Sequence, residues 1–302
     1  MKLVLSLVVM ASVPGCAAAR APSSQMPETT RTTYTTAAGA RDFVLFRPAS
    51  WPAGREDRAL VVMLHGCTQS ADDFARGTRM NAAAERSGFM VLYPEQPAGA
   101  HPQKCWSWYV PEQFTRDRGE AALLAGMIDS VARAEGVSAR HIALVGMSAG
   151  AAMAGNMVIA YPERYAALAM HSGIPALAAT DVAGALTAMR QGVADEDALG
   201  ARALAAMGAR ARPVPVLILH GSTDKVVSPV NLRAASRQWK VVNAGAPGAG
   251  APVEERLFDG VGHAWSGGSA EGTYTAPTGP DATELIVGFL RRVGTIGPRV
   301  LE

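Results

Sequence analysis

The stretch His141-Ile-Ala-Leu-Val-Gly-Met-Ser-Ala-Gly-Ala-Ala-Met-Ala-Gly155 decides the fold of this chain. A short apolar run at 142–145 leads into a Gly-x-Ser-x-Gly pattern at 146–150, which continues in small residues, so we expect a buried strand, a tight turn and a helix. The two glycines lack Cβ atoms, and the strand and the helix can therefore pass close to Ser148. This arrangement is typical of a nucleophile elbow, which lifts the serine Oγ above the sheet. The alternative interpretation is a glycine-rich turn with a capping serine.

The composition allows a full hydrophobic core and argues against several classes of partner. The chain has 302 residues, of which 49% are hydrophobic, and this length suits a single α/β domain. A formal net charge of +2 with 18% charged residues gives no basic stripe, so we expect no nucleic-acid partner. Beyond the N-terminus, no apolar run of the sequence reaches membrane-spanning length.

The N-terminus predicts export from the cytoplasm. Lys2 precedes a short apolar run and a series of small residues, and we assign residues 1–19 to an export signal. Two kinds of processing stay open. Cleavage before Arg20 would release a secreted or periplasmic protein, whereas the segment 13–16 resembles a lipobox that would place a lipid anchor on Cys16 and tether the protein to a membrane.

The remainder of the chain divides into a tether and one domain. The segment 20–30 is polar and contains prolines, which predicts a flexible tether, and residues 31–302 form the catalytic domain of our hypothesis. Two β-rich segments, 32–36 and 41–47, are typical of an antiparallel hairpin. Further strands are expected at 59–64, 89–94, 142–145, 165–170, 214–220 and 253–258. Helices are expected at 70–87, 118–135, 229–242 and 281–292, directly after the elbow, and as a small two-helix cap within 180–208.

This alternation of strands and helices predicts the fold class. Apolar strands that alternate with helices form a mostly parallel central sheet with helices on both faces. We therefore expect an α/β fold with an antiparallel N-terminal hairpin and no second domain. The loops that follow the strands gather at the carboxyl edge of such a sheet, where open α/β sheets place their ligands.

A serine nucleophile needs a base and a group that orients the base. In sheets with a nucleophile elbow these groups follow the serine in the order Asp or Glu, then His. His263 is the one histidine that lies after the strand ending at His220, and it sits in a glycine-containing loop. Asp224 follows that strand and its turn, so we predict Ser148, Asp224 and His263 as a catalytic triad. The alternatives are Asp259 as the orienting carboxylate and a solvent-facing role for His263.

The developing negative charge of an acyl-transfer intermediate needs two backbone donors. The Ala149 N–H follows the nucleophile and supplies the first donor. We assign the second to the Cys67 N–H, in the loop after the strand 59–64, where Gly66 permits a close approach. His65 is then a buried structural residue. No carboxylate or histidine stands at zinc-ligand spacing, and we expect neither a metal nor another cofactor.

Three cysteines allow one disulfide. Cys16 lies in the predicted signal, which leaves Cys67 and Cys105 as a candidate pair in an exported chain. Such a bridge would connect the predicted oxyanion loop to an aromatic loop. The alternative is two unpaired buried thiols.

Tryptophans near these loops are candidates for substrate contact. Trp106 and Trp108 follow Cys105, and Trp265 lies two residues after His263. We expect the three indoles to line an apolar groove for the substrate. The alternative is that each packs in the core.

Several motifs together resemble one known family. They are Leu64-His65-Gly66-Cys67-Thr68-Gln69, Cys105-Trp106-Ser107-Trp108, Gly146-Met147-Ser148-Ala149-Gly150, His171-Ser172-Gly173-Ile174-Pro175 and Gly262-His263-Ala264-Trp265. Over residues 41–292 the chain resembles the poly(3-hydroxybutyrate) depolymerase-type esterases. These are α/β-hydrolases related to feruloyl and acetylxylan esterases.

The resemblance implies a fold, a site and an activity. It implies the α/β-hydrolase fold, the triad of Ser148, Asp224 and His263, an oxyanion hole at Cys67 and Ala149, and a Cys67–Cys105 disulfide. The expected activity is that of an exported serine esterase without a cofactor, with poly- or oligo-(3-hydroxybutyrate) or other short-chain esters as substrates. The alternatives are a feruloyl or acetylxylan esterase and, in another class, a catalytically silent binding protein of the same fold.

Overall fold

The structure is a computed structural model that describes residues 26–36, 39–51, 54 and 58–298. The predicted export signal, Cys16 and most of the predicted tether lie outside the described residues. Strand β1 (Glu28–Thr36) begins inside the segment 20–30, so residues 28–30 are not part of a tether. They pair with β2 (Gly39–Arg47), from Glu28 opposite Arg47 to Thr36 opposite Gly39, and form the predicted antiparallel hairpin.

The described part of the chain forms one eight-stranded sheet in the order β1-β2-β4-β3-β5-β6-β7-β8. The strands after the hairpin are β3 (Leu60–Leu64), β4 (Met90–Pro94), β5 (Ile142–Met147), β6 (Ala167–His171), β7 (Val216–Gly221) and β8 (Val253–Phe258). β2 pairs antiparallel with β4, and all pairs from β4 to β8 are parallel. The predicted mostly parallel sheet with its antiparallel N-terminal strands is therefore confirmed.

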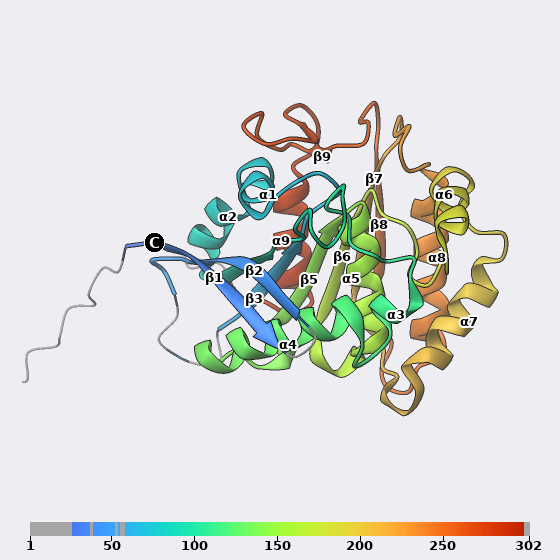
Figure 1. The fold of residues 1–302 in the computed structure, drawn as a ribbon, viewed down its shortest axis with the longest axis horizontal. Helices are drawn as coiled ribbons and strands as arrows, with labels where there is room; N and C mark the ends of the chain where they lie inside the picture. Colours follow the sequence, from blue (N-terminus) through green and yellow to red (C-terminus); the bar gives the residue numbers. More distant parts are fainter. Residues whose placement is uncertain (1–25, 37–38, 52–53, 55–57, 299–302) are drawn as a thin grey trace, which may run out of the picture.

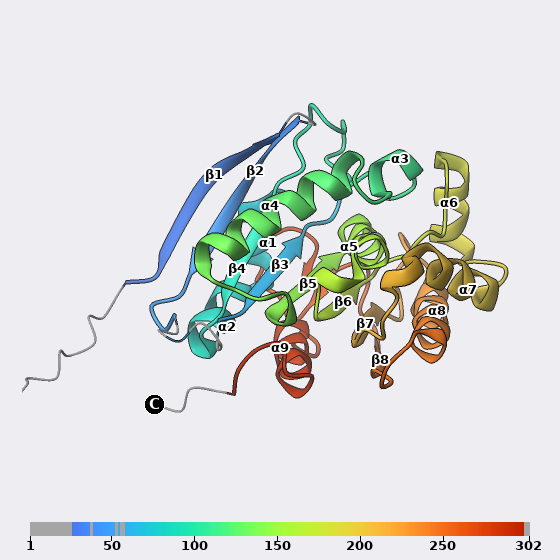
Figure 2. The same ribbon diagram turned by 90° about the horizontal axis from the view of Figure 1, so that it is seen from below.

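Helices cover both faces of this sheet (Figure 1 and Figure 2). The helices of eight or more residues are α1 (Ala71–Thr78), α2 (Met80–Ser87), α4 (Gly119–Glu135), α5 (Ala149–Ala160), α6 (Val182–Gln191), α7 (Glu196–Met207), α8 (Val230–Gly245) and α9 (Ala282–Arg292). The short helix α3 (Pro111–Phe114) lies in the aromatic loop. α4, α5 and α8 pack on one face, and α1, α2 and α9 on the other.

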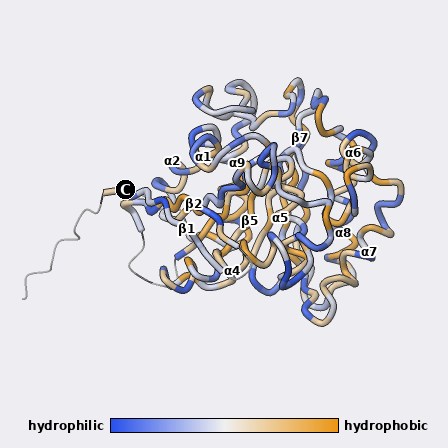
Figure 3. Tube along the Cα trace, in the orientation of Figure 1, coloured by the Kyte–Doolittle hydropathy of each residue, from blue (hydrophilic) through white to orange (hydrophobic). Residues whose placement is uncertain are grey.

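The central strands are apolar along their whole length because they are buried on both faces. In β3, Leu60, Val62 and Leu64 belong to the core beneath α4 and α5. Val61 and Met63 point the other way, into the core beneath α1, α2 and α9. Figure 3 shows the resulting apolar centre, with polar residues in the peripheral loops.

The prediction of one continuous helix at 70–87 is wrong, because the structure has two helices there. Ser70 begins α1 as expected, because its side chain accepts a hydrogen bond from the Asp73 N–H. Arg79 then adopts a left-handed conformation with φ of 56° and separates α1 from α2. Its guanidinium forms an ion pair with Asp281 and donates to the Gly267 carbonyl, so long-range contacts stabilise the break. Local sequence carries no signal for such partners.

The sequence also misses a short parallel pair, β9 (Trp265–Ser266) with β10 (Thr275–Ala276). The loop between these two strands lies at the carboxyl edge of the sheet, at the top of Figure 1, as does the loop that carries His263. The predicted two-helix cap is present as α6 and α7. These loops and α6 surround the carboxyl ends of the parallel strands, where the site is built.

Candidate active site

Ser148 occupies a strained turn between β5 and α5. Its backbone has φ of 55° and ψ of −123°, a conformation that costs a non-glycine residue on the order of 1–3 kcal/mol. The turn closes because two neighbours are glycines. A Cβ on Gly146 would lie 2.3 Å from the Gly150 carbonyl oxygen, and a Cβ on Gly150 would lie 2.1 Å from the Leu64 carbonyl oxygen. The strand–turn–helix predicted around the serine is therefore confirmed.

Ser148 and His263 line the same cavity, which has a volume of about 210 Å³. The cavity is lined by Gly66, Cys67, Gln69, Gln103, Met147, Ser148, Met189, Val226, His263 and Tyr274. Asp224 lies behind the imidazole, with its Oδ2 at 2.7 Å from the His263 Nδ1. Within the described part of the chain, the His263 Nε2 has no hydrogen-bond partner, so that nitrogen is available to the cavity.

The Asp224 carboxylate is buried and accepts several hydrogen bonds. Its Oδ1 accepts from the Val226 and Val227 N–H groups, both at 2.9 Å. Burial alone would raise the pKa of Asp224, but hydrogen bonds from His220 and His263 outweigh it and hold the pKa below its usual value. The carboxylate is therefore ionised at neutral pH, as an orienting group must be.

Asp259, the alternative carboxylate, has another partner. Its Oδ1 accepts from the Ser222 hydroxyl at 3.2 Å. The geometry thus pairs His263 with Asp224 and leaves Asp259 at the end of β8.

His220 is a residue of the site that sequence reasoning missed. It is fully buried at the end of β7, and its Nε2 lies 3.3 Å from the Asp224 Oδ2 and 2.9 Å from the Val227 carbonyl oxygen. Its Nδ1 has no partner among the described residues, and a proton on Nε2 fits the contacts with the carboxylate and the carbonyl. The signal that could have found it is the four-residue spacing from His220 to Asp224 at a strand end.

The loop predicted to hold the oxyanion donor is fixed by its neighbours. The Gly66 N–H donates to the Gln69 Oε1 at 2.9 Å, and the Thr68 N–H donates to the Gln103 carbonyl at 2.6 Å. The disulfide between Cys67 and Cys105 is present, as the resemblance implied. In the described part of the chain, the N–H groups of Cys67 and Ala149 donate to no acceptor in a loop, turn or cap. Both amides are thus available to a ligand.

Two further histidines are structural. Burial lowers the pKa of His65 to about 4, and its Nε2 accepts a hydrogen bond from the Gln96 N–H. Burial, followed by the charge of His220, lowers the pKa of His171 to about 3. Both rings are neutral at pH 7. His65 therefore has the structural role that the sequence suggested.

The three tryptophans expected to line the groove lie elsewhere. Trp106, Trp108 and Trp265 are 0%, 4% and 1% exposed and do not line the cavity. The Trp106 indole donates to the His65 carbonyl, and the Trp265 indole donates to the Thr283 hydroxyl. Each of these two indole N–H groups has a protein partner, which permits deep burial. The three tryptophans are therefore buried outside the cavity lining. The expectation that they contact the substrate in this cavity is wrong.

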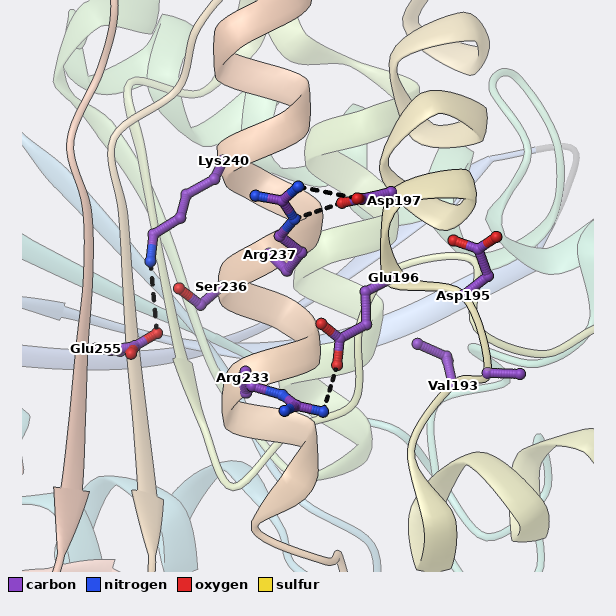
Figure 4. A pocket seen from close by; sticks show the side chains of 10 residues that line it. Val193, Asp195, Glu196, Asp197, Arg233, Ser236, Arg237, Lys240 and Glu255 are labelled. Carbon is purple, nitrogen blue, oxygen red and sulfur yellow. Dashed lines mark hydrogen bonds and ion pairs between the residues drawn. The ribbon is translucent and has the colours of Figure 1, made fainter.

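A larger hollow of about 550 Å³ lies between α7, α8 and β8, away from Ser148 (Figure 4). Six of its charged side chains form ion pairs: Arg237 with Asp197, Arg233 with Glu196, and Lys240 with Glu255. No histidine or cysteine lines it. The smaller cavity, which contains a serine and a histidine, is therefore the candidate active site despite its size.

Comparison with known proteins identifies the family. The family described as Esterase PHB depolymerase matches residues 42–256. The chain belongs to this family. Among its relatives, the poly(3-hydroxyalkanoate) depolymerase C of Paucimonas lemoignei is 34% identical over 194 residues, which are 64% of this chain and 46% of that protein. The feruloyl esterase B of Neurospora crassa is 29% identical over 193 residues, 61% of this chain and 65% of that protein.

These matches are partial for the other proteins as well. A probable acetylxylan esterase A of Aspergillus fumigatus is 29% identical over 188 residues, 60% of this chain and 50% of that protein. This member of the Esterase PHB depolymerase family thus spans about half to two thirds of the length of the curated relatives it matches.

Solved structures confirm the α/β-hydrolase fold. An acetyl xylan esterase from Aspergillus awamori matches with a TM-score of 0.64 and 20% identity, over 78% of this chain and 94% of that one. The esterase 2 of Thermogutta terrifontis matches with a TM-score of 0.60 and 18% identity, over 92% of this chain and 96% of that one. At these identities the likeness concerns the fold.

The described residues contain neither a metal-binding cluster nor a membrane-spanning helix. No group of three or more histidine, cysteine, aspartate or glutamate side chains is placed to hold a metal ion. Among the same residues, no helix combines the length and the apolarity needed to cross a bilayer.

Proposed function

We propose that this protein is a serine esterase that cleaves carboxylic esters through Ser148, His263 and Asp224. The observation that carries the proposal is the convergence of these residues from three loops. Ser148 and His263 line one cavity, and the His263 Nδ1 lies 2.7 Å from the Asp224 Oδ2. Membership of the Esterase PHB depolymerase family supports the same chemistry.

In the acylation step, the Ser148 Oγ attacks the ester carbonyl while the His263 Nε2 takes the serine proton. Asp224 holds the Nδ1–H tautomer and stabilises the imidazolium that forms. The N–H groups of Cys67 and Ala149 stabilise the negative oxygen of the tetrahedral intermediate. The carbon–oxygen bond to the alcohol then breaks, and His263 returns the proton to the leaving alkoxide.

In the deacylation step, water attacks the acyl-enzyme and loses a proton to His263. The bond to the Ser148 Oγ breaks, the proton returns to the serine, and the carboxylic acid leaves. No cofactor enters this sequence of steps.

The cavity favours a small acyl group. Its volume of about 210 Å³ is below the range of about 300–1,000 Å³ typical of sites for drug-sized ligands. Met147, Met189 and Val226 contribute apolar lining. We therefore propose short-chain esters, including oligomers of 3-hydroxybutyrate, as substrates, in line with the name of the depolymerase relative.

A second candidate function is a carbohydrate esterase that removes acetyl groups. The names of the fungal acetylxylan esterases favour it, and an acetyl group fits a small cavity. Kinetics on methyl ferulate, acetylated xylan and hydroxybutyrate oligomers separate the candidates. The highest kcat/KM on acetylated xylan would replace the first proposal by the second.

The esterase proposal is tested by Ser148→Ala. We expect this variant to lose hydrolysis of p-nitrophenyl butyrate by at least about 10³-fold, because the nucleophile acts as a unit with its base. The far-UV circular dichroism should stay that of the wild type. Rates near the wild type would refute the assignment and revive the silent binding protein.

We also propose that the protein acts outside the cytoplasm. The Cys67–Cys105 disulfide fits an oxidising compartment, in agreement with the export signal inferred from the sequence. The intact mass of the exported protein distinguishes cleavage before Arg20 from a lipid anchor at Cys16.

A further inference from the structure

Tyr274 is the aromatic residue at the mouth of the candidate active site. It lines the cavity with Ser148 and His263 and is 44% exposed. Its ring lies edge-on to the His263 imidazole, with 6.3 Å between the ring centroids. Its backbone is left-handed, with φ of 51°, a conformation that is unfavourable for a bulky side chain. Such strain beside a proposed general base motivates a functional hypothesis.

A hydrogen-bond network fixes the loop that carries Tyr274. The preceding residue, Thr273, donates through its N–H to the Asp73 Oδ1 at 3.0 Å and through its hydroxyl to the Asp73 Oδ2 at 2.5 Å. The Gln69 Nε2 donates to the Thr273 carbonyl at 3.1 Å, while its Oε1 accepts from the Gly66 N–H. Gln69 therefore connects the predicted oxyanion loop to the Tyr274 loop and keeps the two at a fixed separation.

The phenol hydroxyl contacts Thr68, the residue that follows the predicted oxyanion donor Cys67. The Thr68 Oγ1 is 2.6 Å from the Cys67 carbonyl oxygen and 3.2 Å from the Tyr274 hydroxyl. Thr68 has one hydroxyl proton, and the shorter contact to the carbonyl uses it. The Tyr274 proton can then be donated to the Thr68 Oγ1 or to an oxygen of a bound ligand.

We propose that Tyr274 is a specificity-determining residue that donates a hydrogen bond from its phenol to a second oxygen of the substrate, close to the scissile ester. This inference rests on the proposed esterase function and deepens it. A simple aliphatic ester has no such oxygen in its acyl chain, whereas a 3-hydroxyacyl ester carries one at its hydroxyl or at the next ester link of an oligomer. The site should therefore favour esters of hydroxy acids over unsubstituted acyl esters.

The test compares two esters that differ by one hydroxyl group, p-nitrophenyl 3-hydroxybutyrate and p-nitrophenyl butyrate. We expect Tyr274→Phe to lower kcat/KM for the hydroxy ester roughly 3- to 10-fold, the effect of one neutral hydrogen bond, and to leave the butyrate ester within about 2-fold. Tyr34→Phe is the matched control, because it removes a phenol hydroxyl from β1, an outermost strand of the sheet. It should change neither rate.

Each other outcome overturns one claim. An equal loss on both esters would mean that Tyr274 acts on the common chemistry or the fold, and unchanged rates on both would mean that the phenol makes no substrate contact. Either result overturns the specificity proposal and leaves the esterase proposal standing. A wild-type protein that hydrolyses neither ester, and whose Ser148 resists phosphonate labelling, overturns the esterase proposal itself.

Discussion

The two hollows of the molecule differ in the side chains that line them. In the larger hollow between α7 and α8, the side chains of Arg233, Arg237 and Lys240 each meet a carboxylate (Figure 4). The smaller cavity is lined by the strained Ser148, by Cys67 and by His263. In the described part of the chain, the Cys67 N–H donates to no acceptor in a loop, turn or cap, and the His263 Nε2 has no hydrogen-bond partner. A strained serine and a histidine in one cavity, rather than volume, thus distinguish the candidate active site.

Among the variants that test this difference between the hollows, we expect the largest loss of activity from Asp224→Asn. The amide introduced at position 224 can donate an N–H to the His263 Nδ1 instead of accepting a hydrogen bond from it. The imidazole then adopts the tautomer with its proton on Nε2, which cannot accept the serine proton. We expect kcat for p-nitrophenyl butyrate to fall by about 10³- to 10⁴-fold with KM nearly unchanged. Steady-state kinetics measure both parameters.

Two matched variants serve as controls. Asp259→Asn removes the alternative carboxylate, and Arg237→Ala breaks an ion pair of the larger hollow. Both should retain kcat within about 2-fold. A larger loss in Asp259→Asn than in Asp224→Asn would reverse the assignment of the orienting residue.

An effect of intermediate size, on the free energy of unfolding, is expected from the buried neutral histidines His65 and His171. The pKa of His65 is lowered to about 4 and that of His171 to about 3, whereas an unfolded histidine titrates near 6.5. Between about pH 6.5 and 4 the unfolded chain binds more protons, so the free energy of unfolding falls as the pH is lowered. Each histidine lowers the free energy of unfolding by roughly 1 kcal/mol, and the two together by about 2 kcal/mol, from pH 6 to pH 5.

Urea unfolding at pH 7.5, 6 and 5 measures this dependence. His171→Gln, which cannot titrate, should show about half of the slope of the wild type. A free energy of unfolding that is constant from pH 6 to pH 5 would contradict the burial of these rings as neutral species.

The smallest effect is expected at His220, whose Nε2 contacts the same carboxylate oxygen, the Asp224 Oδ2, as His263. His220→Leu removes a donor that contacts both the Asp224 carboxylate and the Val227 carbonyl. We expect about a 10-fold loss of kcat, the value of a hydrogen bond to a charged group. His220→Gln, which keeps an N–H donor, should recover part of the activity. Equal losses in the two variants would indicate a packing role alone.

Much of the fold followed from local patterns. Continuous apolar runs such as β3 predict strands buried on both faces, and the glycines around Ser148 predict a turn that side chains would block. Because parallel strands end at one edge of a sheet, chain order alone suggested that the residues 148, 224 and 263 meet. The structure places the last two in hydrogen-bond contact and the first in the same cavity as His263.

The sequence failed where long-range partners decide the local structure. The break between α1 and α2 depends on the contact of Arg79 with Asp281, which lies 202 residues away. Trp265 was expected at the substrate groove, but its indole has a buried acceptor in Thr283. Tyr274 was missed because its exposure and its positive φ arise from contacts of the neighbouring Thr273 with Asp73. Local sequence patterns contain no information about partners so far away in the chain.

Covalent labelling tests the central claim most directly. The wild-type protein and His263→Ala are treated with a p-nitrophenyl phosphonate, and peptide mass spectrometry locates the adduct. The proposed mechanism predicts one adduct per chain, on Ser148, with labelling slowed by at least about 10³-fold in His263→Ala. A wild-type protein that stays unlabelled, or that carries its adduct on another serine, would contradict the convergence of these residues into one reactive site.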